Sequence, residues 1–226
     1  MKRTIILVLT LTVVCTPGIN AQDSKPTFGI RFGGHLTKII GKDFFGNALG
    51  QDFKLGAGIG VNVEIPIAPN FYFQPGLLFS NKGSKITQTI NTATVTSTSY
   101  ITYIEMPLNL MFKPQFGSGH LLIGLGPYIA YGIIGQVRHK PGTNEKIQFK
   151  STVTNADPDD NYLKPFDAGA SMLIGYQFKT RFSVQLNVQR GFIGIEPTFE
   201  DEPDDKSSYK NMGFGVSIGY RFYPRK

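Results

Sequence analysis

The stretch Met212–Phe222, MGFGVSIGYRF, decides the fold. Its residues alternate one by one between an apolar or aromatic set and a small or polar set. The apolar set is Met212, Phe214, Val216, Ile218, Tyr220 and Phe222, and the other is Gly213, Gly215, Ser217, Gly219 and Arg221. Strict alternation is typical of a β-strand with two chemically different faces. The stretch Leu55–Ile65, LGAGIGVNVEI, repeats the pattern.

Six further segments carry the same alternation with varying clarity. They are residues 28–36, 71–80, 100–113, 121–133, 166–178 and 182–189. Most of these segments are about ten residues or longer, enough to cross an apolar band of about 25 Å when the strand is tilted. The sequence therefore predicts eight strands.

The connections between these segments alternate in length. Three are short, at 66–70, 114–119 and 179–181, and four are long and polar, at 38–53, 83–99, 136–163 and 193–208. Short turns at the end that holds both termini, with long loops at the other end, are typical of outer-membrane barrels. We therefore expect an all-β fold, an eight-stranded antiparallel up-and-down transmembrane β-barrel.

The polar face of the strands indicates which side is inside. It carries many glycines and six charged residues, namely Arg31, Glu64, Glu105, Lys113, Asp167 and Arg221, whereas the apolar face has hardly a charge. A soluble barrel or sandwich would bury the apolar face. Here we expect the reverse, with lipid outside, because a closed barrel satisfies every backbone polar group within lipid. An eight-stranded interior is just wide enough for side chains to fill, so the three cations and three anions should neutralise one another in a plugged lumen. A proton or ion path through them is the alternative.

The N-terminus has the pattern of a secretory signal. Lys2 and Arg3 precede an apolar run over residues 5–14, and Ala21 offers a small residue for cleavage. We predict a signal peptide at 1–21 and one barrel domain at 22–226; a short buried helix is the alternative. The single cysteine, Cys15, falls in the signal, so the mature chain has no disulfide. The signal also removes two cations, so the formal charge falls from +7 to +5.

Composition excludes other classes of protein. The chain has 226 residues, a mean hydropathy of -0.09, and beyond its N-terminus no apolar run that approaches the 18 residues of a membrane-spanning helix. Its cations are dispersed and it has no phosphate-binding glycine loop, so we expect no nucleic-acid partner. We also expect no cofactor.

Two long loops carry concentrated charge. The last loop is acidic, with Glu196, Glu200, Asp201, Glu202, Asp204 and Asp205. Clustered carboxylates bind Ca²⁺ or Mg²⁺ in some proteins, but no EF-hand spacing is present, so a solvated acidic loop without a metal is favoured. Cations of the earlier loops are candidates for pairing with lipopolysaccharide phosphates: Lys82, Lys85, Arg138, His139, Lys140, Lys146 and Lys150. Residues 86–99 are β-prone and are expected to extend a hairpin beyond the membrane.

Catalysis requires a nucleophile and a base together. The three histidines are His35, His120 and His139, and none has a serine and an acid in an evident matching register. We therefore predict no catalytic residue and no enzyme activity. A lipid A-modifying enzyme stays open as an alternative, because some small outer-membrane barrels modify the acyl chains of lipid A. Such chemistry would need a nucleophile and a base together, for example a serine and a histidine that face the outer leaflet.

Five segments resemble the PorT-type outer-membrane β-barrel domain. They are APNFYFQPGLLFSNKGSK (68–85), YIEMPLNLMFK (103–113), GLGPYIAYG (124–132), NYLKPFDAGASMLIGYQF (161–178) and KNMGFGVSIGYRFY (210–223). The resemblance implies a small eight-stranded barrel in a Gram-negative outer membrane, surrounded by lipid and lipopolysaccharide and inserted by the barrel-assembly machinery. It also implies a possible link to a secretion complex. One departure is that Pro224, Arg225 and Lys226 follow the final aromatic residue, where the family's assembly signal ends the chain.

The expected function is therefore that of a small outer-membrane barrel which acts without catalysis through its external loops. A structural, adhesion or secretion and assembly accessory role fits this expectation. A lipid A-modifying enzyme and a narrow channel are the alternatives.

Overall fold

The eight expected strands are all present in the computed structural model, which describes residues 25–90, 93–154, 157–158, 161–200 and 205–223. They are β1 (Thr27–Lys42), β2 (Lys54–Ala68), β3 (Phe71–Lys82), β5 (Ala93–Phe112), β7 (Gly119–Lys140), β11 (Phe166–Gln177), β12 (Phe182–Gly191) and β14 (Ser208–Phe222). Six shorter strands accompany them: β4 (Lys85–Ile90), β6 (Gln115–Phe116), β8 (Asn144–Phe149), β9 (Thr152–Val153), β10 (Asn161–Leu163) and β13 (Thr198–Phe199). The expected signal at 1–21 lies outside the described residues. Within the described part of the chain, no helix is long and apolar enough to cross a membrane.

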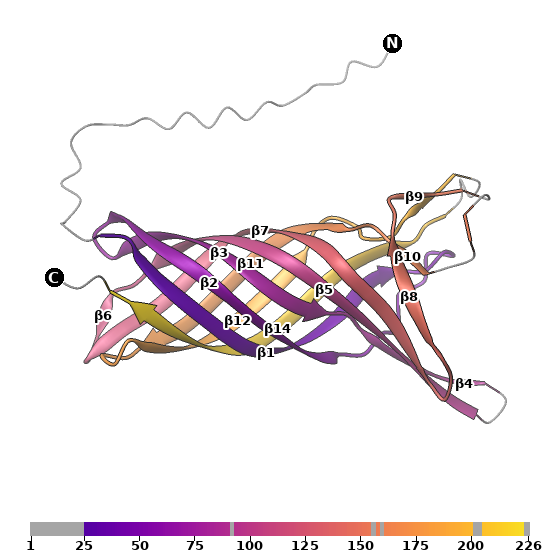
Figure 1. Cartoon of the computed structure of the whole chain (residues 1–226), viewed down its shortest axis with the longest axis horizontal. Helices are drawn as coiled ribbons and strands as arrows, with labels where there is room; N and C mark the ends of the chain where they lie inside the picture. Colours follow the sequence, from indigo (N-terminus) through magenta and orange to yellow (C-terminus); the bar gives the residue numbers. More distant parts are fainter. Residues whose placement is uncertain (1–24, 91–92, 155–156, 159–160, 201–204, 224–226) are drawn as a thin grey trace, which may run out of the picture.

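The eight long strands form a closed ring. Each pairs with the next in the order β1, β2, β3, β5, β7, β11, β12 and β14, and β14 pairs with β1. All eight pairings are antiparallel. The strands run obliquely to the long axis of the molecule (Figure 1). Closure leaves no free edge within the ring, so its backbone groups are paired with one another.

The two faces of the ring have the polarity that the alternation predicts. Large apolar side chains point outward, and Leu55 and Phe28 are 72% and 63% exposed. Charged side chains point inward, and Glu64 and Asp167 are 3% and 0% exposed. A water-soluble protein would bury the first set and expose the second. The ring is therefore apolar outside and charged inside.

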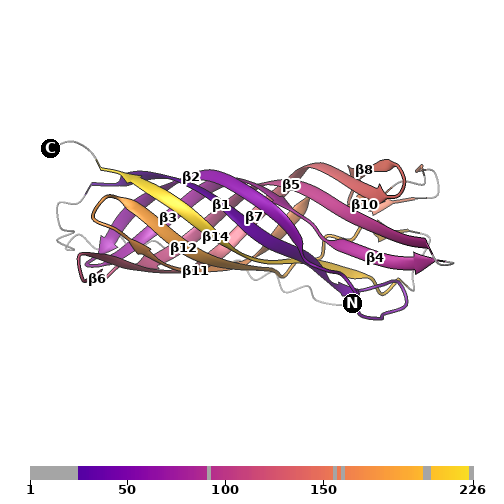
Figure 2. The same ribbon diagram turned by 90° about the horizontal axis from the view of Figure 1, so that it is seen from below.

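The two ends of the ring differ strongly. Short connections lie at the end that holds β6, where β1 also begins and β14 ends, and the long connections lie at the other end (Figure 1). There the loop expected at 83–99 is a hairpin of β4 and β5, which confirms the expected extension, and β7 continues to Lys140 where a loop was expected from residue 136. Strands β4, β5, β7, β8 and β10 pair in that order and project beyond the ring (Figure 2). We call them the outer sheet.

Apolar residues from the segments that connect the long strands, including residues on β8 and β10, pack against the outer end of the ring. Ile195, Ile147 and Leu163 are buried there against side chains of the ring strands. Two glycines on β7 leave space for two side chains of β8, Ile147 and Phe149. A Cβ atom at Gly132 would lie 2.6 Å from the Phe149 ring, and one at Gly135 would lie 2.7 Å from the Ile147 Cβ atom. The outer end of the interior is thus filled by an apolar cap, which sequence alternation does not reveal.

Candidate functional site: the charged interior

One buried carboxylate binds two cations near the end of the ring with short connections. The Glu64 Oε2 atom accepts a hydrogen bond from the Lys113 Nζ atom at 2.6 Å, and the Glu64 Oε1 atom accepts one from Arg221 Nη2 at 2.9 Å. Gln74 Nε2 also donates to Oε1 at 2.9 Å. Both carboxylate oxygens are therefore occupied. We call Glu64, Gln74, Lys113 and Arg221 the Glu64 cluster.

A second cluster, closer to the outer end, has the opposite ratio of charges. The Lys82 Nζ atom lies 3.2 Å from Glu105 Oε1 and 3.9 Å from Asp167 Oδ2. Asp167 Oδ2 also accepts hydrogen bonds from Asn211 Nδ2 at 2.9 Å and Tyr128 Oη at 3.2 Å. The ammonium group lies 4.5 Å from the centre of the Tyr128 ring, a distance typical of a cation–π contact. We call Lys82, Glu105, Tyr128, Asp167 and Asn211 the Lys82 cluster.

The Lys82 cluster is incompletely bonded. Within the described residues, four buried atoms of this cluster make no hydrogen bond: Lys82 Nζ, Glu105 Oε1, Asp167 Oδ1 and Asn211 Oδ1. The first two of these atoms, Lys82 Nζ and Glu105 Oε1, form an ion pair with each other at 3.2 Å, although their geometry is not that of a hydrogen bond. Buried polar atoms without partners are usually satisfied by ordered water.

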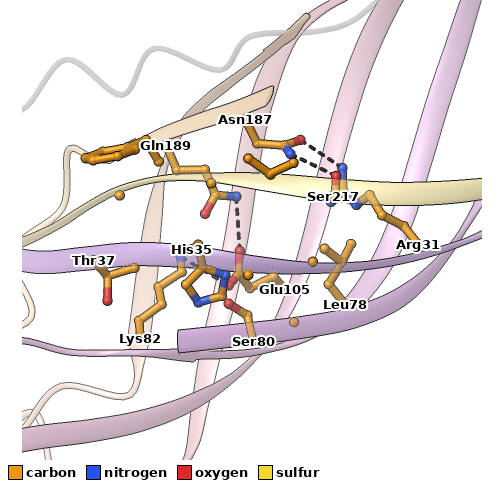
Figure 3. A pocket seen from close by; sticks show the side chains of 17 residues that line it. Arg31, His35, Thr37, Leu78, Ser80, Lys82, Glu105, Asn187, Gln189 and Ser217 are labelled. Carbon is orange, nitrogen blue, oxygen red and sulfur yellow. Dashed lines mark hydrogen bonds and ion pairs between the residues drawn. The ribbon is translucent and has the colours of Figure 1, made fainter. Parts of the chain in front are cut away.

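A cavity of about 70 Å³ lies beside this cluster, inside the ring. Figure 3 shows the side chains of His35, Lys82, Glu105 and Gln189 around it, with Arg31 further along beside Asn187. A water molecule needs about 10–15 Å³ of such space, so the cavity has room for a few ordered waters but not for a continuous aqueous pore. The space beside the Lys82 cluster is thus small and lined by polar and charged side chains.

The structure brings together some of the expected interior charges and separates others. Glu64, Lys113 and Arg221 meet directly, and Glu105 and Asp167 meet through Lys82. Arg31 forms no ion pair within the described residues and donates to Asn187 Oδ1 at 3.4 Å.

Lys82 was expected at the outer rim, and that expectation is wrong, because the residue is 3% exposed inside the ring. The alternation of β3 continues past Ser80, which turns Lys82 inward with Ser80 and Gln74. If the predicted strand at 71–80 had been extended to Lys82, its alternation would have placed Lys82 on the inward face.

The acidic loop does not assemble a metal site in its described part. Glu196 Oε2 accepts a hydrogen bond from the backbone N–H of Tyr209 at 2.8 Å, and Asp205 accepts two from Ser207. Glu200 is exposed. Asp201, Glu202 and Asp204 lie outside the described residues. Among the residues that the structure describes, no group of three or more His, Cys, Asp or Glu side chains is arranged to hold a metal ion.

The outer sheet places a serine, a histidine and a carboxylate side by side. Ser97 on β5 lies opposite His139 on β7, and the Ser97 Oγ and His139 Nδ1 atoms are 2.8 Å apart. The His139 Nε2 atom lies 3.5 Å from Glu145 Oε2, which also accepts a hydrogen bond from Asn161. These partners of His139 were not predicted from the sequence, because the β5–β7 register that joins residues 97 and 139 does not follow from local alternation.

The sequence of residues 16–196 matches the model of one family, the outer membrane protein β-barrel domain. The chain belongs to this outer-membrane β-barrel family. An outer-membrane localisation follows from this membership. A search of curated protein sequences found no match.

Several solved barrels are similar in structure at low sequence identity. OprG from Pseudomonas aeruginosa is 11% identical with a TM-score of 0.48, and the alignment covers 89% of this chain and 98% of that one. Ail from Yersinia pestis, in complex with the heparin analogue sucrose octasulfate, is 12% identical with a TM-score of 0.41, covering 88% and 99%. Neisserial surface protein A is 7% identical with a TM-score of 0.44, covering 88% and 100%.

Proposed function

We propose that the protein is an eight-stranded, up-and-down transmembrane barrel with a plugged lumen that acts without catalysis through its outer sheet. The observation that carries this proposal is the contrast between a filled interior and a large projecting sheet. Charged clusters and the apolar cap occupy the lumen, whereas β4, β5, β7, β8 and β10 extend beyond the ring. The parts available to a partner are thus outside the membrane.

Strand β4 supports an adhesion or accessory role. It is the last strand of the sheet on its side, and apart from a bridge between Lys85 and Asp52 its outer backbone edge has no strand partner in the described part of the chain. Threonines face one another across the hairpin in the pairs Thr87–Thr96 and Thr89–Thr94. A free, polar edge strand accepts an extended segment of another protein by β-strand addition. We propose that β4 is the docking edge.

A hairpin-shortened variant tests this role. Replacing residues 86–97 by a two-residue turn removes β4, while the double substitution Thr87→Ala and Thr96→Ala keeps the edge backbone and serves as the control. After cross-linking in intact outer membranes and detergent solubilisation, the wild type and the alanine control should retain the same partner and the shortened variant should lose it. Retention by the shortened variant, with heat-modifiable folding intact in all three, would exclude β4 as the docking edge.

The resemblance to the PorT-type domain supports a narrower assignment within the family. We propose that the chain belongs to that branch, is exported by the signal at 1–21, is inserted by the barrel-assembly machinery and serves as an accessory to a secretion complex. The cross-linking experiment also tests the last point. Recovery of secretion components supports it, and recovery of unrelated surface proteins alone opposes it.

A lipid A-modifying enzyme is the second candidate, and the contact between Ser97 and His139 favours it. His139 is placed to accept the Ser97 proton while the serine oxygen attacks an ester carbonyl, and to return that proton to the alcohol that leaves as the ester C–O bond breaks. The acyl group on Ser97 would then pass to water or to another hydroxyl. Glu145 lies next to the other ring nitrogen of His139. Mass spectrometry of lipid A from cells that express the wild type or Ser97→Ala separates the candidates. Identical acylation in both, and in deletion cells, supports the non-enzymatic function. Presence of a modification in wild-type cells and its loss in both Ser97→Ala and deletion cells supports the enzyme.

A further inference from the structure

Three cationic side chains lie on the outward face of neighbouring strands: Lys38 on β1, Lys210 on β14 and Arg190 on β12. Their orientation follows from the residues beside them in the chain, which point inward. Thr37 donates to the Gly83 carbonyl inside the ring, Gln189 donates to Glu105, and Asn211 donates to Asp167. Because side chains alternate along a strand, the three cations face the surroundings of the ring.

The strand register gathers these cations around Met212. Met212 lies opposite Lys38 on one neighbouring strand and opposite Arg190 on the other. Lys210 is two residues from Met212 on the same strand and therefore on the same face. Residues directly opposite in an antiparallel pair have Cβ atoms about 5 Å apart, so three long side chains can converge on one group above Met212.

The height of this group along the ring matches the edge of an apolar band. Below Met212, the outward residues of β14 are Phe214, Val216, Ile218, Tyr220 and Phe222. Ten residue steps of about 3.3 Å, tilted by about 40°, span roughly 25 Å. That length equals the apolar band of an outer-membrane barrel. The cations thus lie where the hydrocarbon of the outer leaflet ends and its headgroups begin.

Within the described residues, none of the three cations has an ion-pair partner in the protein. The Lys38 ammonium group lies 4.8 Å from the centre of the Phe53 ring, and Phe53 meets Phe214 edge to face with ring centres 5.2 Å apart. The nearby Glu196 carboxylate is bound to the backbone of Tyr209. Cations at the edge of hydrocarbon are stabilised by anionic headgroups.

From this placement we propose that Lys38, Arg190 and Lys210 form a binding site for a phosphate group of an outer-leaflet glycolipid of the lipid A type. The inference rests on the proposed transmembrane placement of the ring. The lipid phosphate lies over Met212, Arg190 and the two lysines donate to its oxygens, and the acyl chains lie along the apolar column below. The charge of the site and its height both match this ligand.

Native mass spectrometry of the purified full-length protein with added bisphosphorylated lipid A tests the site. The neutral triple variant Lys38→Gln, Arg190→Gln and Lys210→Gln is compared with a matched triple, Lys25→Gln, Lys179→Gln and Arg181→Gln, which removes three exposed cations at the opposite end of the ring. Because each Lys or Arg contact is worth roughly fivefold in affinity, the first triple should bind lipid A roughly 100-fold more weakly. The matched triple and the conservative variant Lys38→Arg with Lys210→Arg should bind as the wild type does.

Two further arms identify the ligand. Dephosphorylated lipid A should bind the wild type as weakly as bisphosphorylated lipid A binds the neutral triple, and inorganic phosphate at equal concentration should not compete. Equal retention by the wild type and the neutral triple, or equal losses in both triples, overturns the site. Heat-modifiable mobility and insertion into vesicles are measured for every variant. A wild type that does not insert overturns the transmembrane placement together with the site, whereas insertion with equal lipid retention overturns the site alone.

Discussion

The two charged clusters inside the ring both pair buried charges, but with opposite ratios of cations to anions. In the Glu64 cluster one carboxylate serves two cations, and every oxygen of Glu64 accepts a hydrogen bond. In the Lys82 cluster one ammonium serves two carboxylates, and four polar atoms of the cluster have no hydrogen bond in the described residues. A cavity adjoins the second cluster. The Glu64 carboxylate is thus fully hydrogen-bonded by protein side chains. In the Lys82 cluster, by contrast, the polar atoms without protein partners need ordered water to complete their hydrogen bonds.

The largest effect is expected from Glu64→Gln. This change leaves Lys113 and Arg221 buried without a carboxylate, and breaking a buried ion network in this way typically costs about 3–5 kcal/mol. Denaturant unfolding in lipid vesicles, followed by heat-modifiable mobility, measures the loss. A loss below about 1 kcal/mol would show that the cluster does not hold the ring together.

Lys82→Met should destabilise the protein less, by about 2 kcal/mol. The change leaves Glu105 and Asp167 without their shared cation, but Gln189, Asn211 and Tyr128 still donate to them and the cavity admits water. The same unfolding assay measures the effect. A loss larger than that of Glu64→Gln would reverse the ranking of the two clusters.

Asp167→Asn should be close to neutral, within about 1 kcal/mol. It removes one of two carboxylates that share a single lysine, so the remaining pair of Lys82 and Glu105 is balanced. Unfolding midpoints of Asp167→Asn and Glu105→Gln, measured side by side, check this expectation. A strongly destabilised Asp167→Asn would mean that the cluster needs both negative charges.

The fold was predictable because alternation is local. Residues 212–222 show one face apolar and one face polar, and the structure places the two sets outside and inside as expected. The site was only partly predictable. Lys82 was misplaced by a strand boundary, and the contact between Ser97 and His139 depends on a register between distant strands.

The apolar cap is the other part that the sequence did not predict. Ile195 and Leu163 come from connections without alternation, and their burial follows from packing in three dimensions.

Conductance separates the plugged interior from a narrow channel. In the proposed function both clusters and the cap plug the lumen, so planar bilayers with the pure wild-type protein should show no steady openings. The Asp167→Asn variant should stay equally silent. Sustained openings in the wild type would favour the channel alternative and would identify the cavity beside Lys82 as part of a continuous path.

Cysteine-directed spin labels test most directly the claim that the ring is charged inside and faces lipid outside. The mature chain would contain no cysteine, so labels can be placed singly at Met172, Val184 and Val216 on the outward face and at Ser171, Ser183 and Ser217 on the inward face. In vesicles, oxygen dissolved in lipid should relax the outward labels strongly and the inward labels weakly, with a period of two along each strand. Equal relaxation of both sets, or strong relaxation of the outward set by a water-soluble nickel complex, would contradict the transmembrane ring.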